Sequence, residues 1–104
     1  MNNVYTYMIK DIVPNGMSQN IMKKLETEEK NDPIIDFTVL NDTNVDNLPL
    51  YVSAISTVTS HAFPLYRGEF MSFDLKPVAL WVMNISRTSN IPYRIIFKMI
   101  NTSN

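Results

Sequence analysis

Alternating apolar and polar residues run through most of this chain, and that period predicts β-strands. Residues 4–9 are rich in β-branched and aromatic side chains, and between residues 34 and 40 the apolar Ile35, Phe37 and Val39 alternate with polar neighbours. Further apolar stretches predict strands at residues 50–59, 65–75, 78–85 and 93–100. Gly68 falls inside one of these strands, where we expect a bulge or bend.

A single segment has the period of a helix. Pro14-Asn15-Gly16 predicts a turn, and Ser18 shortly after it is a candidate N-cap. Apolar residues recur every four positions from Met17 to Leu25, which predicts a helix running to about Lys30. Pro33 is expected to stop the helix, because the residue before a proline resists the helical conformation.

Together these elements predict one domain spanning residues 1–104 with an α+β fold. We expect a mainly antiparallel β-sheet of about five to six strands, with one N-terminal helix packed on it. Connections of hairpin length between the last strands favour the antiparallel arrangement. A small β-sandwich or barrel is the alternative fold.

The composition leaves little with which to build a catalytic or metal site. The 104 residues include no cysteine, one histidine and two glycines. That excludes a thiolate zinc site, a cysteine nucleophile and a glycine-rich phosphate loop. The histidine, His61, directly follows Ser60, and adjacent side chains of an extended chain point to opposite faces, so the two make a poor catalytic pair. We therefore predict that the protein is not an enzyme and binds no metal or cofactor.

The formal net charge of −1 is the sum of two halves of opposite sign. Residues 1–50 carry eight acids and four bases, whereas residues 51–104 carry two acids and five bases. We define the acidic segment as a candidate surface for a basic protein partner, made of Glu26, Glu28, Glu29, Asp32, Asp36, Asp42 and Asp46. We define the basic strip as a candidate site for phosphate or an acidic neighbouring copy, made of Arg87, Arg94 and Lys98.

The segment Lys76-Pro77-Val78-Ala79-Leu80-Trp81-Val82, followed by Phe97-Lys98-Met99-Ile100, resembles the closing hairpin of the phage uracil-DNA glycosylase inhibitors. The resemblance lies within residues 76–100, about a quarter of the chain. It implies a small protein whose acidic part occupies a basic groove of its partner. No functional residue carries over, because that family is strongly acidic and this chain is almost neutral.

These observations favour a small non-enzymatic protein-binding module, of the kind with which a phage or virus inhibits or modulates a host protein. The first alternative is a structural or assembly protein that forms homo-oligomers, such as a virion component with polar, asparagine-rich loops. A nucleic-acid accessory protein that uses the basic strip is a weaker alternative, because the net charge is close to neutral. No apolar run approaches the roughly 18 residues of a membrane span and no signal-peptide pattern is present, so we expect an intracellular protein or a virion component, without membrane contact.

Overall fold

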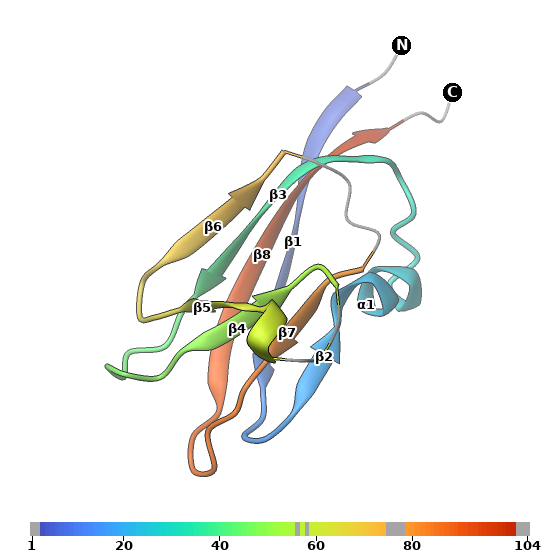
Figure 1. Cartoon of the computed structure of the whole chain (residues 1–104). Helices are drawn as coiled ribbons and strands as arrows, with labels where there is room; N and C mark the ends of the chain where they lie inside the picture. The colour runs from blue at the N-terminus through green and yellow to red at the C-terminus, as the bar shows by residue number, and fades with distance from the viewer. Residues whose placement is uncertain (1–2, 56, 58, 75–78, 102–104) are drawn as a thin grey trace.

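The computed structural model describes residues 3–55, 57, 59–74 and 79–101. In this part of the chain, eight strands form two four-stranded sheets, accompanied by one short α-helix and one 3-10 turn. Figure 1 shows the elements, which in chain order are β1 (Asn3–Val13), β2 (Ser18–Asn20), α1 (Ile21–Thr27), β3 (Ile34–Asn41), β4 (Leu50–Ser53), η1 (Thr59–His61), β5 (Phe63–Leu65), β6 (Phe70–Phe73), β7 (Trp81–Met83) and β8 (Ile91–Asn101).

The two sheets are built from strands that are far apart in sequence. One sheet has the order β1-β8-β3-β6 and the other the order β2-β7-β4-β5, and neighbouring strands are antiparallel. The pairs β1–β8, β2–β7, β3–β6 and β4–β5 are those of one long hairpin whose two arms wrap together from sheet to sheet. This is the strand order of an eight-stranded jelly roll.

The length of β1 and β8 sets the length of the molecule. Each has eleven residues, and the two pair from Asn3 opposite Asn101 to Val13 opposite Ile91. The molecule is accordingly elongated, with extents of 47 Å, 24 Å and 22 Å. Both ends of the described chain therefore lie at the same end of the fold (Figure 1).

The predicted class, a mainly antiparallel sheet structure with one short helix, agrees with the structure, but the expected strand count is wrong. The extra strands β2 and β5 have three residues each, too few to show a period. Pro64 lies in β5, where a proline is tolerated because β5 is an edge strand. Neither sheet closes into a barrel among the described strands.

The last two strands do not form the expected hairpin. β7 pairs with β2 and β4, whereas β8 pairs with β1 and β3, so they belong to different sheets. The segment that resembles a glycosylase-inhibitor hairpin is therefore not a hairpin in this chain, and its residues 76–78 lie outside the described residues. Gly68 also differs from expectation: it lies in the turn between β5 and β6 with a φ of 73°, not in a strand.

The helix is shorter than predicted because the chain is first extended. Ser18 belongs to β2, which pairs with β7, so it cannot serve as the N-cap. Asn20 takes that role, and its side-chain oxygen accepts a hydrogen bond from the backbone N–H of Lys23. Beyond the C-cap, Glu29 adopts a left-handed φ of 58°, which ends the helical path before Pro33 is reached.

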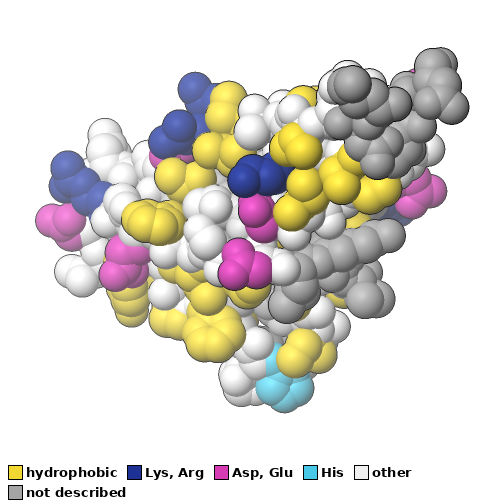
Figure 2. Space-filling model, turned by 90° about the horizontal axis from the view of Figure 1, so that it is seen from above, with side chains coloured by type: hydrophobic (Ala, Val, Ile, Leu, Met, Phe, Trp, Pro, Cys, Tyr) yellow, Lys and Arg dark blue, Asp and Glu magenta, His cyan; other side chains and the backbone are white. Residues whose placement is uncertain are grey.

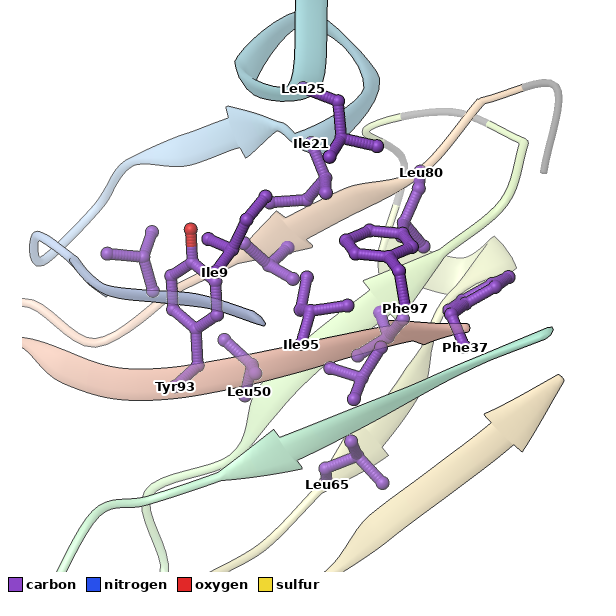
Figure 3. Packing of buried hydrophobic residues seen from close by; sticks show 14 of the residues in the cluster. Ile9, Ile21, Leu25, Phe37, Leu50, Leu65, Leu80, Tyr93, Ile95 and Phe97 are labelled. Carbon is purple, nitrogen blue, oxygen red and sulfur yellow. The ribbon is translucent and has the colours of Figure 1, made fainter. Parts of the chain in front are cut away.

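The inner faces of the two sheets enclose one hydrophobic core, part of which is drawn in Figure 3. Phe37 of β3 stacks on Phe73 of β6 with ring centroids 4.7 Å apart, and α1 points Ile21 and Leu25 into the same core. β8 contributes every second residue to it, namely Ile91, Tyr93, Ile95, Phe97 and Met99. Because side chains alternate along a strand, the intervening residues of β8 lie on the opposite surface of its sheet.

Two buried asparagines fasten loops to the ends of strands. The side-chain amide of Asn41 donates to the carbonyls of Leu48 (3.0 Å) and Leu65 (2.8 Å), and its oxygen accepts from the N–H of Thr43 (2.9 Å). Asn84, which follows β7, makes the same pattern of bonds with Val13, Ser89 and Ser86. Each side chain satisfies backbone groups that would otherwise be buried without partners.

Candidate interaction surface

One surface of the β1-β8-β3-β6 sheet faces away from the core and is partly apolar. We call it the outer face, and its apolar members are Val4, Met8, Ile12, Leu40, Phe70, Pro92, Ile96 and Ile100. Phe70 and Val4 are 64% and 59% exposed, and Met8 and Ile12 are each 50% exposed. Val4, Met8 and Ile12 belong to β1 and Phe70 belongs to β6, so the most exposed apolar side chains lie along the two edges of the sheet.

The strand register aligns these apolar side chains into cross-strand rows. Val4 lies opposite Ile100 and Met8 opposite Ile96 across β1 and β8. Toward the other edge of the sheet, on the same face, Leu40 of β3 lies opposite Phe70 of β6. Directly opposite side chains contact one another across a sheet, so each row is a pair of adjacent apolar side chains rather than two isolated residues.

Ion pairs separate the apolar rows. The Arg94 guanidinium donates two hydrogen bonds to the Asp42 carboxylate, at 2.6 Å and 3.0 Å, and these bonds raise the pKa of Arg94. The ammonium of Lys98 lies 3.7 Å from the carboxylate of Asp36 on the neighbouring strand. Figure 2 shows hydrophobic side chains interspersed with basic and acidic ones on the surface seen from above. A shallow depression on the outer face is lined by both kinds of side chain, including Met8, Ile12, Lys10 and Arg94.

The structure divides the acidic segment among different surroundings. Asp36 and Asp42 lie on the outer face, paired with Lys98 and Arg94 as described above. Asp46, in the loop after β3, lies 3.4 Å from Arg67. Three of the seven acids thus have an ion-pair partner within the chain, and a role for the segment in binding another protein stays a prediction.

The acids near α1 either accept hydrogen bonds from tyrosines of β1 or face solvent. Glu28 accepts a hydrogen bond from the Tyr7 hydroxyl, and Asp32 accepts one of 2.5 Å from the Tyr5 hydroxyl. The side chains of Glu26 and Glu29 are exposed and make no ion pair within the described part of the chain. They are the acids of this segment that are best placed to meet a basic partner.

The basic strip is also divided. Arg94 and Lys98 share the outer face, as the alternation of β8 predicts, but each is neutralised by an acid on or just after β3. Arg87 lies in the loop between β7 and β8, where its carbonyl accepts a hydrogen bond of 3.2 Å from the side chain of Asn15. It lines a different depression, beside the turn between β1 and β2, and does not join the other two bases.

Tyrosines and acids bind α1 and the following loop to the inner side of β1. The hydrogen bond to Asp32, together with partial burial and the negative charge, raises the pKa of Tyr5 to about 12. The hydrogen bond to Glu28 raises the pKa of Tyr7 in the same way, and the ammonium of Lys30 lies 4.8 Å from the centre of the Tyr7 ring. Both hydroxyls donate hydrogen bonds to carboxylates of the chain, so neither is placed to donate a proton to a bound substrate.

Reasoning from the sequence missed the apolar members of the outer face. The signal was present, because both sets of alternate residues in β1 and in β8 contain large apolar side chains. A strand that is apolar on both sides is ordinarily buried on both sides. Here one of those sides lies on the outer face, and that difference is visible only once the partner sheet is known.

In the described ranges, no group of three or more histidine and acidic side chains is arranged to hold a metal ion. No helix there is long and apolar enough to cross a membrane. No protein-family model matches the chain, and no match was found among curated proteins or solved structures.

Proposed function

We propose that this chain is a non-enzymatic protein-binding module that binds its partner through the outer face of the β1-β8-β3-β6 sheet. The observation that carries the proposal is the set of exposed apolar side chains on that face, led by Phe70 and Val4. Burying these side chains on a partner is favourable by about 25 cal/mol per Å² of apolar surface. The ion pairs between the apolar rows supply polar groups within the contact.

The outer face supports binding better than the acidic segment does. A charge that is already paired within the chain must be desolvated on binding without gaining a new partner, which costs free energy. Asp36, Asp42 and Asp46 are paired in this way, and because Asp36 and Asp42 lie on the outer face, binding there depends on its apolar side chains and not on these charges. Apolar side chains carry no such penalty. Inhibition or modulation of a host protein, expected from the sequence, would then depend on surface complementarity and not on a concentrated negative field.

The test compares two variants that each replace two exposed apolar residues with lysine, one on the outer face and one in loops. Phe70→Lys combined with Ile12→Lys adds charge to the outer face, and Ile55→Lys combined with Ile85→Lys adds it to exposed apolar positions in loops. Affinity capture with wild-type protein should retain partner proteins that the loop variant also retains and the outer-face variant loses. Equal capture by both variants would refute binding through this face.

An assembly protein is a second candidate, favoured by the strand order. Eight-stranded jelly rolls occur in viral capsid and lectin domains as well as in cupins, so this fold-level analogy raises the candidate without deciding it. The same outer face would then contact other copies or other components of a particle. Light scattering across a concentration series tests it, since a monomer at every concentration would contradict self-assembly.

A further inference from the structure

β1 is the outermost strand of its sheet, and the hydrogen bonds of β8 show which of its backbone groups face outward. The N–H of Asp42 donates to the carbonyl of Pro92 (2.9 Å), and the N–H of Ile100 donates to the carbonyl of Pro33 (3.0 Å). The even-numbered residues of β8 therefore turn their backbone groups toward β3, and the odd-numbered ones turn toward β1. Odd-numbered residues of β1 lie opposite odd-numbered residues of β8, so the even-numbered residues of β1 direct N–H and C=O away from the sheet.

These outward groups are capped at one end of β1 only. The N–H of Ile12 donates to the Asp11 carboxylate (2.8 Å), and the carbonyl of Ile12 accepts from the side-chain amide of Gln19 (3.1 Å). No comparable cap within the described residues serves the outward groups between Val4 and Lys10. This leaves a run of backbone donors and acceptors in the geometry that a further strand requires.

The protections that the sequence of an edge strand can provide are missing from β1, whose inner side is contacted by α1 and the following loop. It has eleven residues, no proline and no register shift against β8. Lys10 is the only base in it, and its only acid, Asp11, is ion-paired with Lys24. Natural edge strands are commonly protected by prolines, bulges or several charges, so this edge is suited to pairing.

We propose that β1 pairs in antiparallel orientation with β1 of a second copy, joining the two β1-β8-β3-β6 sheets into one. The two-fold axis passes through Tyr7, which places Val4 opposite Lys10 of the second copy and Thr6 opposite its Met8. This register uses every outward backbone group from Val4 to Lys10 and ends where the Ile12 cap begins. The proposal goes beyond binding through the outer face, because it adds a second contact that rests on backbone groups of β1.

A second copy fits this edge because the sequence of β1 is self-complementary about Tyr7. No charged residue lies opposite a like charge, since Lys10 faces Val4 across the axis. Glu28 and Lys30 of each copy both contact Tyr7 and therefore lie beside the axis. Their opposite charges cancel within each copy. Two-fold dimers are the commonest protein assemblies, and a symmetric edge contact forms a closed pair and not an open chain.

A proline in an outward position tests the pairing without breaking the fold. Thr6→Pro removes an outward N–H and leaves the ladder with β8 intact, whereas the matched control Thr6→Val keeps that N–H. We expect light scattering to show a dimer for the wild type and for Thr6→Val, and a monomer for Thr6→Pro with an unchanged circular dichroism spectrum. A wild type that is monomeric at every concentration, or a folded Thr6→Pro that remains dimeric, would overturn the proposal.

Cross-linking tests the register and does not depend on how proline is tolerated. The chain has no cysteine, so one introduced cysteine can form a disulfide only with another copy. Tyr7→Cys would place two Cα atoms about 4.5 Å apart across the axis, within the range of a disulfide. Lys10→Cys is the control, since its two copies would lie about 20 Å apart. Mild oxidation should cross-link the first variant and not the second; equal cross-linking of both contradicts the register.

The same measurements separate this proposal from binding through the outer face. Phe70→Lys alters that face on β6, at the opposite edge of the sheet from β1, and should remain dimeric. If Phe70→Lys abolishes the dimer and Thr6→Pro does not, copies meet through the outer face and the edge pairing is wrong. If Thr6→Pro is monomeric yet still captures its partner protein, the edge pairing holds and the outer face serves another protein.

Discussion

The amide of Asn41 is expected to be one of the most important polar side chains for the stability of this fold. Asn41→Ala removes three buried hydrogen bonds, to the carbonyls of Leu48 and Leu65 and from the N–H of Thr43. Each intramolecular hydrogen bond contributes about 1 kcal/mol net, so the variant should lose about 3 kcal/mol of unfolding free energy. A chain of this size has roughly 5–15 kcal/mol in total, so the loss is a large fraction.

Thermal unfolding followed by circular dichroism measures this loss. For a domain of this length, each kcal/mol shifts Tm by about 4–8 °C, so Asn41→Ala should lower Tm by about 12–24 °C. Asn44→Ala is the matched control, because Asn44 lies in the same loop with its side chain exposed, and it should change stability by less than about 0.5 kcal/mol. Equal Tm values for the two variants would refute the reasoning that the buried amide organises this loop.

An isosteric variant separates lost hydrogen bonds from lost volume. Asn41→Asp keeps the oxygen that accepts from Thr43 but brings a carboxylate toward two carbonyls. The folded protein should therefore raise the pKa of the introduced carboxyl above its ordinary value of about 3.9. Protons then bind the folded state more tightly than the unfolded state, so the variant should regain stability as pH falls and lose it as pH rises. A deficit independent of pH would contradict this account.

Three further perturbations test other parts of the structure. Asp32→Asn should lower the pKa of Tyr5 from about 12 toward its ordinary range, as measured by phenolate absorbance against a Tyr5→Phe reference. In the wild type, the stability from this raised pKa is present below about pH 10 and is lost as pH rises toward 12, and an unchanged titration in Asp32→Asn would disprove the coupling. A double-mutant cycle on Arg94 and Asp42 should give a favourable coupling that weakens as salt is added, because both side chains are partly exposed; no coupling would mean that the bidentate contact does not persist in solution. Gly16→Ala should cost about 1 kcal/mol through its φ of 71° alone, since no atom lies within 4 Å of the added Cβ, and a neutral result in urea unfolding would argue against this turn geometry.

The sequence predicted β3 and β8 closely, β1 and the strands between residues 50 and 85 with different bounds, and β2 and β5 not at all. The period of the chain revealed β3 and β8 nearly to their ends, because each buries alternate residues along its whole length. β2 and β5 are defined by their pairing partners in the other sheet, and three residues carry no period of their own. The N-cap was misplaced for the same reason, since the pairing of Ser18 with Met83 depends on a strand more than sixty residues away.

The site shows a similar division. The side-by-side placement of Arg94 and Lys98 followed from strand alternation, but their neutralisation by Asp42 and Asp36 depends on β3 lying next to β8. Asn41 is one of twelve asparagines in the chain, and nothing in its immediate sequence distinguishes a buried amide from an exposed one. Long-range pairing, which sequence period does not reveal, thus decided which charges were free and which polar groups were structural.

The position of β8 has a consequence for how the chain reaches its native state. β8 lies between β1 and β3 and follows both of them in the chain, so among the described strands β1 lacks its one sheet neighbour, and β3 lacks one of its two, until β8 has been synthesised. Pairings between the beginning and end of a chain are slow to form, and unpaired strands are prone to misassociation in the meantime. We therefore expect the nascent chain to need shielding by a chaperone, and removal of β8 to release an aggregating fragment and not a smaller folded domain.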